Sequence, residues 1–277
     1  MNRTTQPLGL AQLSLLDVAA PQLIRLAADV GFDFIGARVR AVTGNEPVYD
    51  FQPGSPLLAE TLAAIDETGV TVGDIEFLLV DGSDQRDAWL AMMEAGQALG
   101  AKTMTVAASL ENEAQLTDLL AQMTEDGRQF GIMPTLEAIS YQAVNTLPQA
   151  ARIARAAGCQ LVADTLHLSR VATPTEQLTE YAELIPMLQL CDGPAKVPAD
   201  RDGLVLESRS QRGVPGDGEF GLSHYVAALP AETPLSVEAP ADATVARIGH
   251  TAWAETLKAG LDRVIGDATA LREAVGQ

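Results

Sequence analysis

Cysteines, histidines and basic residues are scarce in this sequence. The two cysteines, Cys159 and Cys191, are too few for a disulfide framework or a thiolate zinc cluster, both of which need several. There are 18 lysines and arginines against 37 aspartates and glutamates, which gives a formal net charge of −19. Because such a surface repels phosphate backbones and anionic lipids, we expect neither nucleic acid nor a membrane surface as a partner.

Long apolar runs are also missing. No stretch of about 18 apolar residues could cross a membrane, and the interrupted apolar stretch near the N-terminus lacks the cleavage site of a signal peptide. We therefore expect a cytoplasmic protein. No low-complexity linker divides the 277 residues, of which 47% are hydrophobic, so the sequence predicts one globular domain over residues 1–277.

What the sequence does contain is a regular alternation of short apolar runs and longer segments with helical periodicity. The predicted strands cover residues 8–16, 33–37, 70–80, 103–107, 131–136, 160–163, 186–191 and 234–237. The predicted helices cover residues 20–30, 56–67, 84–100, 111–129, 145–157, 175–184, 222–229 and 253–275, with Asp84 as the cap of the third.

Continuous apolar strands are typical of parallel sheets that are buried on both faces. Eight strand–helix units in about 270 residues favour a closed (β/α)8 TIM barrel in a single domain. An open doubly wound sheet is the alternative, although no GxGxxG motif follows the first strand. Residues 192–221 form one long irregular stretch, and a loop of that length inside a compact domain usually serves function.

Acidic residues stand where three of the predicted strands end. Glu137, Asp164 and Glu238 follow the fifth, sixth and eighth strands, and barrel enzymes place their chemistry at these carboxyl ends. Carboxylates brought together repel one another, so we expect a cation between them. Oxygen ligands favour Mg²⁺ or Mn²⁺, and Gln189 on the seventh strand could add its amide oxygen. The alternative is that each carboxylate only caps the helix that follows it.

Four further polar residues are candidates to bind a substrate. They are Arg38, Glu76, His167 and Arg212. The two arginines could hold hydroxyl groups or an anion, and Arg212 lies in the long 192–221 stretch. These side chains suit a small polyhydroxylated substrate, and no glycine-rich phosphate loop is evident. Each of the four could instead make only structural contacts.

Five segments in order resemble the sugar phosphate isomerase/epimerase family, the xylose-isomerase-like TIM barrels. They are Thr-Leu-Glu at 135–137, Val-Ala-Asp-Thr-Leu-His-Leu at 162–168, Gln-Leu-Cys-Asp at 189–192, Pro-Gly-Asp-Gly-Glu at 215–219 and Leu-Ser-Val-Glu at 235–238. The resemblance covers nearly the whole chain. It implies that Glu137, Asp164 and Glu238 bind a metal and that the two glutamates also move protons. It further implies that His167 contacts a substrate oxygen, whereas Gln189 stands where many members have a metal-binding histidine.

A divalent ion at such a site would polarise a substrate carbonyl and allow a carboxylate to remove a neighbouring proton, giving a metal-stabilised enediolate. Return of the proton gives an isomerase or epimerase acting on a sugar, keto-sugar or cyclitol. Loss of a β-substituent gives a lyase or dehydratase acting on a keto-polyol. A non-catalytic sugar-binding barrel is a further alternative. An endonuclease is disfavoured by the net charge and by a total of three histidines. The resemblance also allows a homo-oligomer, since such barrels are often dimers or tetramers.

Overall fold

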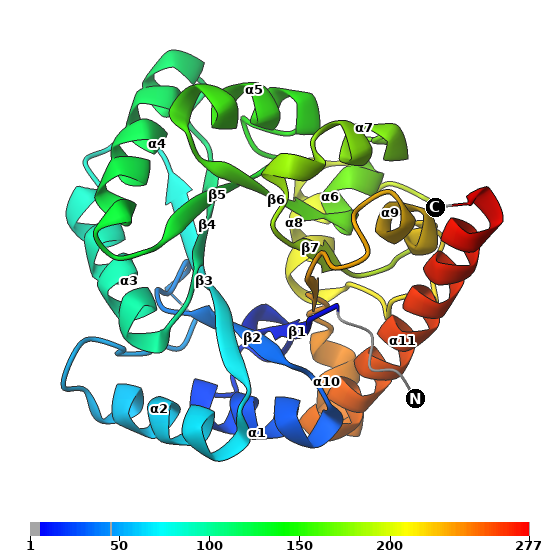
Figure 1. Cartoon of the computed structure of the whole chain (residues 1–277), viewed down its shortest axis with the longest axis horizontal. Coiled ribbons are helices and arrows are strands. Elements are labelled where there is room, and N and C mark those ends of the chain that lie inside the picture. The colour runs from blue at the N-terminus through cyan, green and yellow to red at the C-terminus, as the bar shows by residue number, and fades with distance from the viewer. Residues whose placement is uncertain (1–5, 45, 277) are drawn as a thin grey trace.

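In the computed structural model, which describes residues 6–44 and 46–276, eight parallel strands close into a barrel (Figure 1). The strand order follows the chain, and β8 returns to pair with β1 through Leu10 and Val237. The predicted single-domain (β/α)8 TIM barrel is therefore confirmed. The strands are β1 Leu8–Ala11, β2 Phe34–Arg38, β3 Thr71–Val80, β4 Thr103–Ala108, β5 Met133–Glu137, β6 Gln160–Asp164, β7 Leu188–Leu190 and β8 Leu235–Val237.

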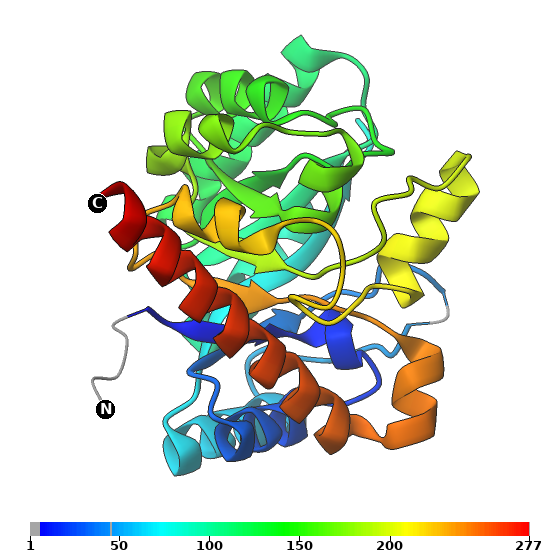
Figure 2. The same cartoon turned by 90° about the vertical axis from the view of Figure 1, so that its right-hand side faces the viewer.

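Helices surround the barrel, and the last of them, α11, crosses its side against α9 and α1 (Figure 2). The α-helices are α1 Ala20–Val30, α2 Pro56–Thr68, α3 Arg86–Leu99, α4 Glu113–Arg128, α5 Leu147–Ala157, α6 Thr165–Arg170, α7 Thr175–Glu180, α8 Arg201–Ser210, α9 Leu222–Ala227, α10 Asp242–Ile248 and α11 His250–Val275. Two short 3₁₀ helices, η1 Gln12–Leu15 and η2 Ala182–Leu184, complete the elements. Within the described residues, no helix is both long and apolar enough to cross a membrane.

The helix α1 shows how local sequence sets these elements. It begins with Pro21 in its first turn, where the missing N–H of proline costs nothing. Its apolar face is buried against the barrel, with Leu23 and Ala27 fully inaccessible to solvent. It ends at Gly31, whose φ of +92° is readily adopted only by glycine. The predicted range of 20–30 matches this helix.

The first predicted strand, 8–16, is wrong beyond Ala11, because the chain turns there into η1. Polar side chains replace the strand ladder at this point. Gln12 accepts a hydrogen bond from the backbone N–H of Arg38 at 2.8 Å. Ser14 donates to the carbonyl of Val237 at 3.1 Å and accepts from the N–H of Ala239 at 2.9 Å. These bonds tie η1 across the carboxyl ends of β2 and β8.

Other predicted boundaries also need correction. The third helix begins at Arg86 with Gln85 at its N-cap, so Asp84 is not the cap, although its carboxylate accepts from the Arg86 N–H at 3.2 Å. The 192–221 stretch is not wholly irregular, because it contains α8. That helix is polar, with only two buried residues, Glu207 and Ser208, and has no apolar stripe, so hydrophobic periodicity could not reveal it. The short helices α6 and α10 were likewise not predicted.

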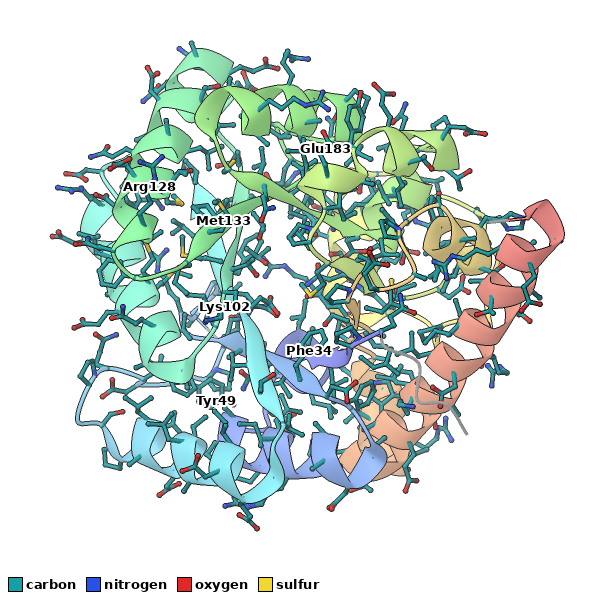
Figure 3. The ribbon with its side chains drawn as sticks, viewed as in Figure 1. Phe34, Tyr49, Lys102, Arg128, Met133 and Glu183 are labelled. Carbon is teal, nitrogen blue, oxygen red and sulfur yellow. The ribbon has the colours of Figure 1, made fainter. Side chains whose placement is uncertain are left out.

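The amino-terminal end of the barrel is filled by the ring of Phe34, which packs with Val162 and Met187. Figure 3 labels Phe34 close to the centre of the barrel. The ring fits because a glycine faces it from each neighbouring strand, Gly9 on β1 and Gly73 on β3. A Cβ atom at Gly9 would come within 2.2 Å of the ring, and one at Gly73 within 2.7 Å. Small residues on β1 and β3 therefore make room for one large residue on β2.

We expect Gly9→Ala to lower the free energy of unfolding by about 1–3 kcal/mol, because the new methyl group overpacks the barrel against Phe34. Urea denaturation of the two proteins measures the difference. The matched control is Gly266→Ala at an exposed position of α11, where a Cβ would meet nothing within 4 Å. This substitution should raise the free energy of unfolding by about 0.5–1 kcal/mol, because alanine favours a helix interior over glycine. Equal effects of the two substitutions would contradict the proposed packing.

Candidate active site

A pocket of about 710 Å³, open to solvent on one side, lies at the carboxyl ends of the strands. Helix α8 stands at this end of the barrel and contributes Ser208 and Arg209 to the lining (Figure 2). Six of the predicted site residues line the pocket: Arg38, Glu76, Glu137, His167, Arg212 and Glu238. The other two, Asp164 and Gln189, are buried and contact Arg212 and Glu238 respectively.

The guanidinium of Arg212 lies between two of the predicted carboxylates. Its Nη1 is 2.6 Å from Oδ2 of Asp164, and its Nη2 is 3.0 Å from Oε2 of Glu238. Burial alone would raise the pKa of Asp164, but the neighbouring guanidinium more than offsets it and holds that pKa below its usual value. The pKa of Glu238 is raised well above its usual value, because burial outweighs the effect of Arg212. Arg212 is thus a structural counter-ion as well as a lining residue.

Glu137, Asp164 and His167 form a compact cluster. One ligand atom from each lies within 4.8 Å of the other two, and all three side chains are buried. Asp164 caps α6 by accepting from the Leu166 N–H at 2.7 Å. This cap fixes the start of the helix that carries His167 to within 3.6 Å of Glu137.

His167 is neutral near pH 7. Burial lowers the pKa of its imidazole to about 4. Its Nδ1 lies 3.1 Å from the hydroxyl of Ser140, and the ring of Tyr141 stands edge-on at 5.6 Å. These contacts orient the ring so that Nε2 faces Glu137, at 3.6 Å from its Oε1. Sequence reasoning placed His167 against a substrate oxygen, and the structure puts it beside two candidate metal ligands.

The side-chain amide of Gln189 on β7 has a partner for its nitrogen but none for its oxygen. Its Nε2 donates to Oε1 of Glu238 at 3.3 Å. Its Oε1 is buried and, within the described residues, has no hydrogen-bond partner. A buried polar atom left without a partner costs about 1–3 kcal/mol. The unpaired oxygen is therefore suited to accept a cation or a donor group that enters the pocket.

A second charged pair lies on β2 and β3. Nη2 of Arg38 is 3.3 Å from Oε2 of Glu76, and both side chains are buried. Burial raises the pKa of Glu76, although Arg38 opposes this. Both residues line the same pocket as Glu137. Their positions on the second and third predicted strands had made them candidates for this site.

Asp74 was missed by the sequence reasoning. It lies two residues before Glu76 on β3, so the two side chains share one face of the strand. Both of its oxygens are buried without a partner among the described residues. Its pKa is raised well above the usual value, by burial and by the charge of Glu76. A Cβ at Gly36 would come within 3 Å of both carboxyl groups, so glycine on β2 leaves the space that they occupy.

The charges in the pocket fit a divalent cation. Burial raises the pKa of Glu137 to about 8, so a proton compensates this carboxylate near neutral pH when no cation is present. Three arginines line the pocket, against four glutamates in its lining and Asp164 beneath it, so full ionisation would leave a surplus of two negative charges, and an ionised Asp74 would add a third. The arginines are Arg38, Arg209 and Arg212, and the glutamates are Glu46, Glu76, Glu137 and Glu238.

The 192–221 segment is held in place by buried polar contacts. Asp192 accepts hydrogen bonds from the N–H groups of Gly193, Gly216 and Phe220 at 2.9–3.1 Å. Arg170 on α6 forms a buried ion pair with Glu207 on α8. Ser208 follows Glu207, and its backbone carbonyl accepts a hydrogen bond from Nε of Arg212 at 2.8 Å. The segment therefore acts as a fixed support for Arg212.

Comparison with known proteins agrees with this architecture. The sequence pattern of the family described as "Xylose isomerase-like TIM barrel" matches residues 24–263, so the chain belongs to that family. No curated protein matches the sequence.

Solved structures share the fold at low identity. A xylose isomerase-like TIM barrel/4-hydroxyphenylpyruvate dioxygenase fusion protein is 22% identical, with a TM-score of 0.79 over 96% of this chain; the chain spans only 44% of that protein. The IolI protein with a bound zinc atom is 18% identical, with a TM-score of 0.77 over 95% of this chain and 99% of that one.

Two further structures carry enzymatic names. An L-ribulose 3-epimerase is 17% identical, with a TM-score of 0.70 over 98% of both chains. The probable 3-DHS dehydratase AsbF from Bacillus anthracis is 14% identical, with a TM-score of 0.69 over 93% of this chain and 98% of that one. At these identities the likeness establishes the fold.

We expect Arg170→Met to lower the free energy of unfolding by about 3–5 kcal/mol, because it leaves the buried carboxylate of Glu207 without its partner. The double substitution Arg170→Met/Glu207→Met removes both charges and should recover at least half of that loss. Urea denaturation of the wild type, both single variants and the double variant gives the coupling between the two side chains. A coupling near zero would show that the pair does not hold α8 to the barrel.

Proposed function

We propose that the chain is a divalent-metal-dependent isomerase or epimerase acting on a small sugar, keto-sugar or cyclitol. The observation that carries the proposal is the buried cluster of Glu137, Asp164 and His167 beside a pocket at the carboxyl ends of the strands. Membership of the xylose isomerase-like family and the shared fold with an L-ribulose 3-epimerase support it. The polar lining of the pocket suits a polyhydroxylated substrate.

The donors of the site are mostly oxygens, which favours Mn²⁺ or Mg²⁺ as the ion. In the proposal Glu137, Asp164 and Glu238 hold the ion through carboxylates, and Gln189 through its unpaired amide oxygen. When bound, the ion would polarise a substrate carbonyl and so lower the pKa of the neighbouring C–H group.

The residues of the chain would then move the proton. Glu137 is the most available base, because neither of its oxygens is hydrogen-bonded within the described part of the chain, and Nε2 of His167 is 3.6 Å from its Oε1. Neutral His167 can donate a hydrogen bond to a substrate oxygen without adding charge. Arg38 would bind a further hydroxyl group or an anion of the substrate. Glu238 would return the proton in an epimerase.

A lyase or dehydratase acting on a keto-polyol is the second candidate, and the contacts of Glu238 favour it. Its two carboxylate oxygens are engaged, one with Gln189 and the other with Arg212. Two-base epimerisation needs both glutamates to exchange a proton with the substrate carbon, whereas elimination needs only one of them as the base, and another group can protonate the leaving group. The shared fold with a probable 3-DHS dehydratase adds to this candidate.

Removal of divalent ions with a chelator should abolish activity, and Mn²⁺ should restore it. The measurement is NMR of a panel of ketoses and cyclitol ketones in D₂O, which detects deuterium incorporation next to the carbonyl. A mixture of two isomers would support the isomerase or epimerase, and an unsaturated product that absorbs in the ultraviolet would support the dehydratase. Full turnover in the chelator would reject the metal mechanism. No metal binding together with no exchange would favour a sugar-binding barrel without catalysis.

We expect Glu238→Gln to lower turnover at least about 100-fold while the fold stays intact, because an amide of the same shape cannot accept or deliver the proton. Circular dichroism checks the fold, and NMR detection of the product isomer checks turnover, since Glu137 alone could still exchange the substrate proton with D₂O. The matched control is Glu183→Gln, which removes a carboxylate that pairs with Arg155 on the surface and should leave turnover unchanged. Wild-type turnover in Glu238→Gln would exclude a proton-transfer role.

A further inference from the structure

All donor atoms of the Arg212 side chain are engaged with the protein. Besides its contacts with Asp164 and Glu238, Nη1 donates to the carbonyl of Glu238 at 3.1 Å. Nε donates to the carbonyl of Ser208 at 2.8 Å, and Nη2 lies 3.3 Å from the hydroxyl of Ser208. The side chain is buried, with a relative accessibility of 4%. It is therefore built into the site rather than held out toward a substrate.

The two carboxylates that Arg212 contacts have no oxygen left over. Asp164 uses Oδ2 for Arg212 and Oδ1 for the Leu166 N–H. Glu238 uses Oε2 for Arg212 and Oε1 for the amide of Gln189. A divalent ion could bind Asp164 or Glu238 only by sharing an oxygen with one of these donors or by displacing it.

The other two candidate ligands, Glu137 and Gln189, have oxygens that are not engaged by the protein. Glu137 and the amide oxygen of Gln189 are free of hydrogen bonds within the described residues. One half of the predicted metal site thus has open donor atoms, and the other half is already neutralised by a fixed positive charge.

We propose that Arg212 acts as an internal counter-ion that competes with the divalent ion for Asp164 and Glu238 and so limits the metal affinity of the site. The inference rests on the proposed metal-dependent function. Without metal, the guanidinium compensates the buried carboxylates and keeps the site folded. With metal, it shares the same oxygens and repels the ion, so affinity is lower than the four ligands alone would give.

The test is the affinity for Mn²⁺ alone, measured by calorimetry and by the electron paramagnetic resonance signal of free Mn²⁺. Three proteins are compared at one pH and ionic strength: the wild type, Arg212→Met and Arg38→Met. Arg38 is a matched control, because it is also a buried arginine of the pocket but pairs with Glu76 and not with Asp164 or Glu238. Thermal unfolding of each protein with and without Mn²⁺ gives a second readout.

We expect Arg212→Met to bind Mn²⁺ at least about tenfold more tightly than the wild type, and Arg38→Met to differ from it by less than about threefold. We also expect Arg212→Met to have a lower melting temperature than the wild type without metal. Added Mn²⁺ should raise the melting temperature of Arg212→Met by more than it raises that of the wild type. If Arg212→Met does not fold without metal, Arg212→Lys replaces it. A lysine ammonium cannot form the planar two-carboxylate contact, so this variant should bind Mn²⁺ at least about threefold more tightly than the wild type.

Equal or weaker Mn²⁺ binding by the Arg212 variants than by the wild type would overturn the inference while leaving the metal-dependent function intact. An increase in Mn²⁺ affinity in Arg38→Met as large as that in Arg212→Met would overturn it too, since that result would reflect the overall charge of the pocket. Absence of Mn²⁺ binding in all of these proteins would overturn the proposed function, and the inference with it.

Discussion

The buried carboxylates at the carboxyl end of the barrel need compensating positive charge, and this requirement governs the rest of the site. An ionised carboxylate in a poorly solvated pocket is costly unless a cation or a proton compensates it. The structure uses both means. Arg212 holds the pKa of Asp164 below its usual value, whereas burial raises the pKa of Glu137 to about 8. The remaining negative charge accounts for the proposal of a divalent ion.

Backbone geometry brings these charged residues together. The strands β5, β6 and β8 end at the same rim, so residues distant in the sequence meet there. Asp164 is held in place as the N-cap of α6, and the same helix positions His167. The opposite end of the barrel is packed with Phe34 and its apolar neighbours. Stability and chemistry are thus separated along the barrel axis, as in other proteins of this architecture.

The sequence predicted the barrel and most of its elements because continuous apolar strands and amphipathic helices leave a strong periodic signal. It also predicted that Glu137, Asp164 and Glu238 converge, since strand ends meet in a barrel. The compact cluster contains Glu137 and Asp164 but has His167 as its third member, and Glu238 is instead joined to Asp164 through Arg212. It could not reveal α8, which is polar and is held by the Arg170–Glu207 ion pair. Nor could it assign partners to Arg212, because the contacts with Asp164 and Glu238 join residues 48 and 26 positions apart.

Arg212 reaches the site from the segment between β7 and α9, whereas the candidate ligands Glu137, Asp164 and Gln189 belong to barrel strands. Strand residues are constrained by pairing on both sides, but connecting segments tolerate insertion and replacement. The positive charge of the pocket could therefore change during evolution while the acidic rim stayed the same. Under the proposed competition between Arg212 and a divalent ion, remodelling this one connection would change the affinity for the ion without redesigning the barrel.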